Sequence, residues 1–158
     1  MVTETKAAMV AAVGSAGAVE SFQKTVSGRI LGASWRKRSA AERAFEVLTF
    51  AFDLEPRDLA IKLRQLFDDR NKAIHSAETD DPVEPHPLGT NTGAGNAHFT
   101  VERAAEASAL ATGLLLDCVS HVRTGAPFAG LKVRLGPHQE GLRERARQVA
   151  ALKARLKA

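Results

Sequence analysis

The chain has 158 residues, of which 44% are hydrophobic and 25% charged, and a formal net charge of +4. A chain of this length and composition can bury a core as one domain, which argues against intrinsic disorder. Abundant alanine, the absence of tyrosine and the lack of β-branched runs favour helices over strands and predict an all-α fold.

Cys118 is the only cysteine, so no internal disulfide can form and nothing indicates an oxidising compartment. On an apolar helix face it is expected to be a core residue. Residues 7–19 are rich in alanine and glycine, with Glu4 before them and few large apolar side chains, unlike a signal peptide. No stretch approaches the roughly 20 apolar residues of a spanning helix. These features predict a cytoplasmic protein that does not enter a membrane.

The first predicted helix covers residues 4–27, with apolar residues at near-helical spacing from Val10 to Val26. Gly14 and Gly17 interrupt it, and each costs about 1 kcal/mol relative to alanine in a helix interior. A helix that crosses closely at the two glycines would explain this cost, as would a simple tight packing contact, which is the reading we expect.

Residues 28–38 predict a connector with Trp35 beside three basic residues, which is either a nucleic-acid contact or a solvated turn. Ser39 and Glu42 have the spacing of a capping box, in which each side chain satisfies a free amide at the helix start. A second helix is therefore predicted to run to about Asp53.

A third helix is predicted over residues 57–77, with Pro56 in the first turn, where proline is tolerated. Its apolar stripe consists of Leu59, Leu63, Leu66, Phe67 and Ile74. Arg70 falls inside that stripe, where an arginine is unexpected.

Residues 79–98 predict a long loop without regular structure, because they hold three prolines and three glycines. Loops of this length are usually functional or disordered. The loop carries His86, His98, Asp80 and Asp81, but their spacing matches no familiar ligand pattern, so no metal site is predicted.

Thr100 is predicted to cap a fourth helix that runs to about Arg123. Residues 124–136, with Pro127 and several glycines, predict a second linker. Pro137 then opens a last, amphipathic helix.

The excess positive charge lies in the C-terminal segment. Residues 131–158 contain eight Lys and Arg against two Glu. Residues 1–130 contain the other fourteen Lys and Arg, against sixteen Asp and Glu. A basic amphipathic helix can cover the core, dock on a partner or lie along phosphates. For the last of these, Arg143, Arg147 and Lys153 are the candidate nucleic-acid contacts.

The strongest functional signal is the run R-N-K-A-I-H at residues 70–75. On a helix, Asp68, Asn71 and His75 share one flanking face, whereas Arg70 is offset from His75 by roughly 140°. Arg70 can therefore meet the imidazole only through its long side chain or through a second chain. This predicts a site at an edge or interface.

The form R-N-x-x-x-H, on the third of four helices and before a loop, resembles the signature of the HEPN superfamily. The resemblance covers roughly residues 5–123. It implies a four-helix up-and-down bundle, which residues 1–125 would form together with the loop 79–98. Residues 126–158, a linker and a basic C-terminal helix, lie outside the resemblance.

The resemblance also implies a homodimer in which two motifs meet in one cleft and cut RNA without a metal or other cofactor. Such proteins resemble toxins of toxin and antitoxin pairs or components of antiviral defence. Some members carry a tyrosine two residues after the histidine, which an antitoxin modifies. Here that position is Ala77 and the chain has no tyrosine, so this mode of neutralisation is not predicted.

The residue types suit this chemistry. Histidine can accept or donate a proton near neutral pH, and arginine offers a fork of donors to phosphate oxygens. Arg70 and His75 are the predicted catalytic residues. In supporting roles, Asn71 would orient His75 or hold a phosphate oxygen, Lys72 would add positive potential, and Asp68 lies on the same flanking face.

The sequence is also compatible with two alternatives. Asp68 and Asp69 precede Arg70 closely enough to form a surface salt bridge with it, which would make His75 an ordinary C-terminal residue of the helix. The protein could also be a non-catalytic helical module that engages nucleic acid or a protein through its basic segments.

Overall fold

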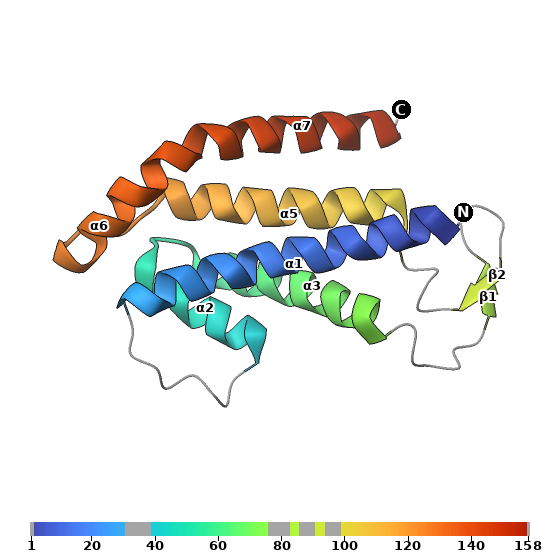
Figure 1. The fold of residues 1–158 in the computed structure, drawn as a ribbon, viewed down its shortest axis with the longest axis horizontal. Helices are drawn as coiled ribbons and strands as arrows, with labels where there is room; N and C mark the ends of the chain where they lie inside the picture. The colour runs from blue at the N-terminus through green and yellow to red at the C-terminus, as the bar shows by residue number, and fades with distance from the viewer. Residues whose placement is uncertain (1, 31–38, 76–82, 86–90, 94–98, 158) are drawn as a thin grey trace.

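The computed structural model describes residues 2–30, 39–75, 83–85, 91–93 and 99–157 (Figure 1). The helices are α1 (Val2–Ile30), α2 (Ala40–Ala51), α3 (Pro56–His75), α5 (Val101–Ser120), α6 (Ala126–Leu135) and α7 (Gln139–Lys157). A short 3-10 helix, Gly136–His138, joins α6 to α7. Two short strands, β1 (Val83–Pro85) and β2 (Asn91–Gly93), pair antiparallel. The prediction of an all-α bundle is confirmed, with one small hairpin added.

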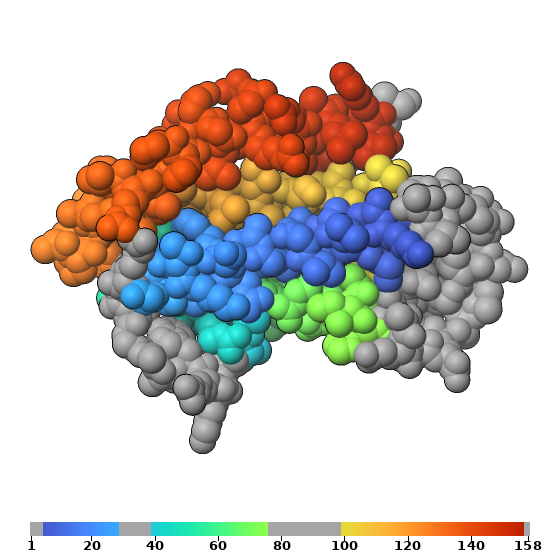
Figure 2. All heavy atoms as spheres, viewed as in Figure 1, coloured from blue at the N-terminus to red at the C-terminus, as the bar shows by residue number. Residues whose placement is uncertain are grey.

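Four helices enclose the core. α1 contacts α2, α3 and α5, and α3 also contacts α2 and α5. α7 lies along α5 and adds a further layer (Figures 1 and 2). α3, α5 and α7 reverse direction in turn, as in an up-and-down bundle, whereas α1 and α5 run in the same direction (Figure 1). α2 has 12 residues against 29 in α1, so it covers only part of the length of α1.

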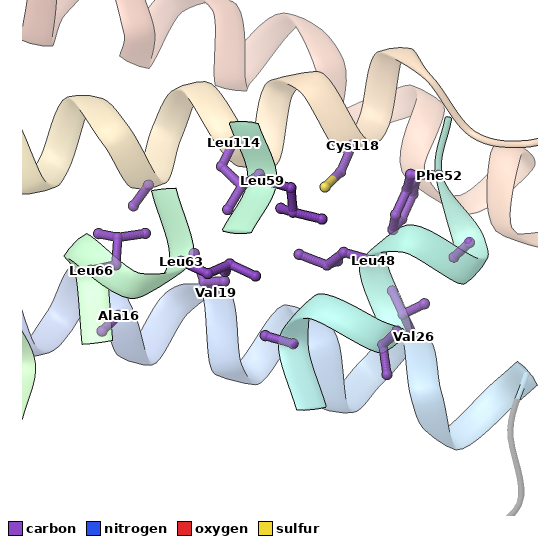
Figure 3. Packing of buried hydrophobic residues seen from close by; sticks show 14 of the residues in the cluster. Ala16, Val19, Val26, Leu48, Phe52, Leu59, Leu63, Leu66, Leu114 and Cys118 are labelled. Atoms are coloured by element: carbon purple, nitrogen blue, oxygen red, sulfur yellow. The ribbon is translucent and has the colours of Figure 1, made fainter. Parts of the chain in front are cut away.

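The core is built from apolar side chains that all four bundle helices contribute (Figure 3). Its fully buried members include Val19, Val26, Leu48, Phe52, Leu59, Leu63, Leu66, Leu114 and Cys118. The rings of Phe22 and Phe52 stack with centroids 5.7 Å apart. Cys118 is thus a core residue, as predicted, and burial raises the pKa of its thiol.

Local sequence signals set the helix starts as expected. The Ser39 amide donates to Glu42 Oε2 at 2.8 Å, and the Glu42 amide donates to Ser39 Oγ at 3.2 Å, which completes the predicted capping box. Thr100 caps α5 by accepting from the Arg103 amide at 3.2 Å. α5 ends at Ser120 rather than Arg123, because Val122 forms a β-bridge with Phe52.

Two predictions of irregular structure were wrong. The predicted linker 124–136 contains α6, which begins with Pro127 in its first turn and buries Leu131 against the core. Within the predicted loop 79–98, β1 and β2 form a hairpin. Tertiary burial and strand pairing outweigh the breaker residues in these segments.

The surroundings of several residues on α1 and α3 also differ from prediction. Val10, expected on an apolar face, is 71% exposed. A Cβ added at Gly14 or Gly17 would meet nothing within 4 Å, so the described part of the chain shows neither a crossing helix nor a tight packing contact there. Ile74 is 48% exposed, although it continues the α3 stripe. At this end of α3, it is Ala73, roughly 100° away around the helix, that packs against the buried cluster of Ala8, Ala12 and Phe99.

Candidate functional site

Arg70 lies on the side of α3 that faces α1, and four contacts fix its guanidinium. Nη1 donates to Glu20 Oε2 at 3.0 Å, whereas Nε and Nη2 both donate to Asn71 Oδ1, at 3.3 and 3.1 Å. The guanidinium carbon also lies 5.2 Å from the centre of the Phe67 ring. The side chain is 24% exposed. Arg70 is therefore held in one orientation at the edge of the core.

Glu20 on α1 is the carboxylate that compensates Arg70. Its oxygens are shared, because Lys24 Nζ lies 3.0 Å from Oε1 while Arg70 binds Oε2. The hydrogen bond from Lys24 lowers the pKa of Glu20, and the charge of Arg70 lowers it further against the opposing effect of burial. Glu20 thus stays ionised at neutral pH, and the charge of Arg70 is balanced within its own chain.

His75 is the last residue of α3 and is exposed to solvent. It lies roughly 140° around the helix from Arg70, on the outward face that Asp68 and Lys72 also occupy. The hydrogen bonds of Arg70 go to Glu20 and Asn71, so one chain does not bring the guanidinium and the imidazole together. Asn71, which we expected to orient His75 or hold a phosphate, contacts Arg70.

The salt bridge considered above, between Arg70 and its neighbours Asp68 or Asp69, is replaced by the pair with Glu20. Asp69 is only 3% exposed, and its Oδ1 accepts from Arg103 Nη2 at 3.1 Å. The sequence did not indicate this pair, in which Asp69 is buried and Arg103 is partly exposed. Its two residues lie on different helices, and only their packing brings them together.

A groove of about 530 Å³ runs beside α3 on its outward side and reaches α5. We call it the α3 groove; its lining residues are Arg57, Ala60, Ile61, Arg64, Gln65, Asp68, Asp69, Lys72 and Arg103. It therefore includes Lys72 and Asp68, two of the predicted supporting residues, but not Arg70. A second hollow, between α2 and α3, shares Ala60, Arg64 and Asp68 with it.

The basic residues of α7 differ in their surroundings. Arg143 binds Glu140 at 3.5 Å, and Arg147 binds both Glu140 and Glu144 at 2.8 Å. Lys153 instead faces a hollow of about 420 Å³ that α3 and α5 also line. Two of the three predicted nucleic-acid contacts are thus paired within their own helix.

Several predictions fall outside the described residues. These are the basic connector around Trp35 and the loop residues Asp80, Asp81, His86 and His98. Among the residues that the structure describes, no three His, Cys, Asp or Glu side chains gather as metal ligands would. Within the same residues, no helix is long and apolar enough to cross a membrane.

Comparison with known proteins adds no family to this picture. No protein-family model matches the chain, and neither a curated protein nor a solved structure matches it.

Proposed function

We propose that the protein is a metal-independent endoribonuclease of the toxin or antiviral-defence type, and that it acts as a homodimer in the cytoplasm. Arg70 and His75 from two chains would form its composite site. The observation that carries the proposal is the fixed guanidinium of Arg70, with an exposed imidazole about 1.4 turns further along the same helix.

The chemistry requires a base, an acid and a stabiliser of negative charge. The 2′-hydroxyl of RNA loses a proton and attacks the adjacent phosphorus, and the 5′-oxygen leaves with a proton. The two His75 imidazoles of a dimer could accept and donate these protons. The two Arg70 guanidinium groups would hold the phosphate oxygens as their charge grows.

The ion pair with Glu20 limits how Arg70 can act. An arginine has five N–H groups, and the bonds to Glu20 and Asn71 use three of them. Two N–H groups remain for a phosphate. Glu20 and Asn71 would then position the guanidinium rather than compete for it.

The proposal is tested by incubating the purified protein with single-stranded RNA in excess chelator. We expect cleavage that leaves 2′,3′-cyclic phosphate ends, and we expect Arg70→Ala and His75→Ala each to lower the rate by roughly 100-fold or more. His138→Ala and Arg145→Ala change exposed residues of the same types and serve as matched controls. Full cleavage by both site variants would reject the assignment.

The balanced charge of Arg70 favours one alternative, a non-catalytic module that engages nucleic acid or a protein partner such as an antitoxin. In that case Arg70→Ala would leave binding intact, whereas removal of residues 137–158 would abolish it. Intact RNA after prolonged incubation, together with binding that depends on the C-terminal helix, would support this alternative over the nuclease.

A further inference from the structure

We infer that the α3 groove binds the phosphate backbone of single-stranded nucleic acid, with Arg57, Arg64 and Lys72 as the phosphate contacts. The inference rests on the proposed function only in taking the strand to be RNA. It moves the main nucleic-acid contact from α7, where the sequence suggested it, to the outward face of α3.

The three cations form a single row. At about 100° per residue, Arg57, Arg64 and Lys72 lie within a sector of roughly 80°, and His75 falls in the same sector. At about 1.5 Å per residue, the row from Arg57 to Lys72 is roughly 22 Å long. All four side chains are exposed. The row therefore leads along one helix face to the predicted catalytic imidazole.

These cations are free to bind a ligand. Within the described part of the chain, Arg57, Arg64 and Lys72 make no ion pair, whereas Arg143 and Arg147 are paired along α7. Arg103, at the far side of the groove, binds the buried carboxylate of Asp69. The negative charge of Asp69 is therefore already compensated by Arg103. Asp68 is the groove carboxylate that remains open to solvent, and it would oppose an anion.

The lining of the groove favours a phosphate chain over an acidic protein. Tight protein interfaces usually centre on buried aromatic or large apolar anchors. Among its lining residues, the groove has no aromatic side chain, and Ile61 is the one large apolar side chain. Regularly placed cations with few apolar contacts suit a repeating charge, and they predict binding with little sequence preference.

The test uses a labelled 2′-O-methyl oligouridylate, which cannot be cut because its 2′-hydroxyls are blocked. Binding is measured by fluorescence anisotropy at several salt concentrations. We expect Arg64→Ala and Lys72→Ala each to weaken binding roughly fivefold at low salt and to lower the slope of log K against log salt by about 0.7. Asp68→Asn should tighten binding, because it removes the opposing charge.

Arg145→Ala is the matched control, because it removes one exposed positive charge from α7 and should leave the Kd unchanged. Circular dichroism checks that each variant keeps its helices. Three results would each overturn the inference. The first is an equal effect of Arg64→Ala and Arg145→Ala, and the second is no binding by the wild-type chain at low salt. The third is tighter binding of an oligoglutamate of equal charge than of the oligouridylate. If the oligouridylate binds through the groove but unmodified RNA stays intact, the inference that the groove binds nucleic acid holds, and the nuclease proposal fails.

Discussion

At the scale of single residues, Arg70 shows how a charge is kept beside a core. A guanidinium that points toward apolar neighbours loses water contacts, and hydrogen bonds to charged or polar groups must replace them. Glu20 and Asn71 supply those bonds, and the Phe67 ring covers one side. The side chain of Asn71 thus holds the guanidinium of Arg70, its neighbour in the sequence.

Glu20→Gln should reveal this pair through the pH dependence of stability. Because its partners lower the pKa of Glu20, the ionised form stabilises the fold above the ordinary value of 4.5, and this contribution is lost as the pH falls below it. We expect the variant to be less stable by about 0.5–1 kcal/mol at neutral pH. In urea titrations this difference should shrink below pH 4.5.

Glu140→Gln, which removes an exposed carboxylate of α7, is the control and should have a smaller effect at neutral pH. A difference between wild type and Glu20→Gln that persists unchanged in acid would mean that the carboxylate contributes nothing through its charge.

At the scale of elements, the helix starts are fixed locally, whereas the extent of each helix depends on packing. The capping box at Ser39 and Glu42 satisfies amides that the first turn of α2 would leave free. α6 has no such side-chain cap, and the burial of Leu131 stabilises it instead. Breaker residues alone therefore do not exclude a helix.

Ser39→Ala should lower the free energy of unfolding by about 1 kcal/mol, because it leaves the Glu42 amide without its acceptor. Ser39→Asp retains an acceptor and should cost far less. Chemical denaturation of the three proteins measures the difference. Equal stability of the serine and alanine forms would show that water replaces the cap without loss.

At the scale of the whole molecule, the separation of Arg70 and His75 around α3 requires a second chain if the two are to act together. Two-fold symmetry would place two copies of each group in one cleft. The proposed nuclease is thus active only as a dimer, and its activity should depend on protein concentration.

Mixing inactive Arg70→Ala and His75→Ala chains tests this arrangement directly. Each mixed dimer would retain one guanidinium and one imidazole from opposite chains, with water in place of the second imidazole as acid or base. Refolding the two variants together should therefore restore part of the wild-type cleavage rate. Sedimentation of the mixture confirms that dimers form. Refolded mixed dimers that stay inactive would contradict a composite site.

The sequence by itself determined the helical class, the capped starts of α2 and α5, the burial of Cys118 and the candidate motif at residues 70–75. These features depend on periodicity and on interactions within a few residues, which can be read along the chain. α6, the hairpin and the open surface over Gly14 did not follow from it.

Only the tertiary structure decided the ion-pair partners of Arg70 and Asp69. Glu20 and Arg70 are 50 residues apart, and Asp69 and Arg103 are 34 residues apart. No local pattern encodes either pair, because both depend on how α1 and α5 pack against α3. The same packing left one face of α3 uncovered, and that face carries the free cations and His75.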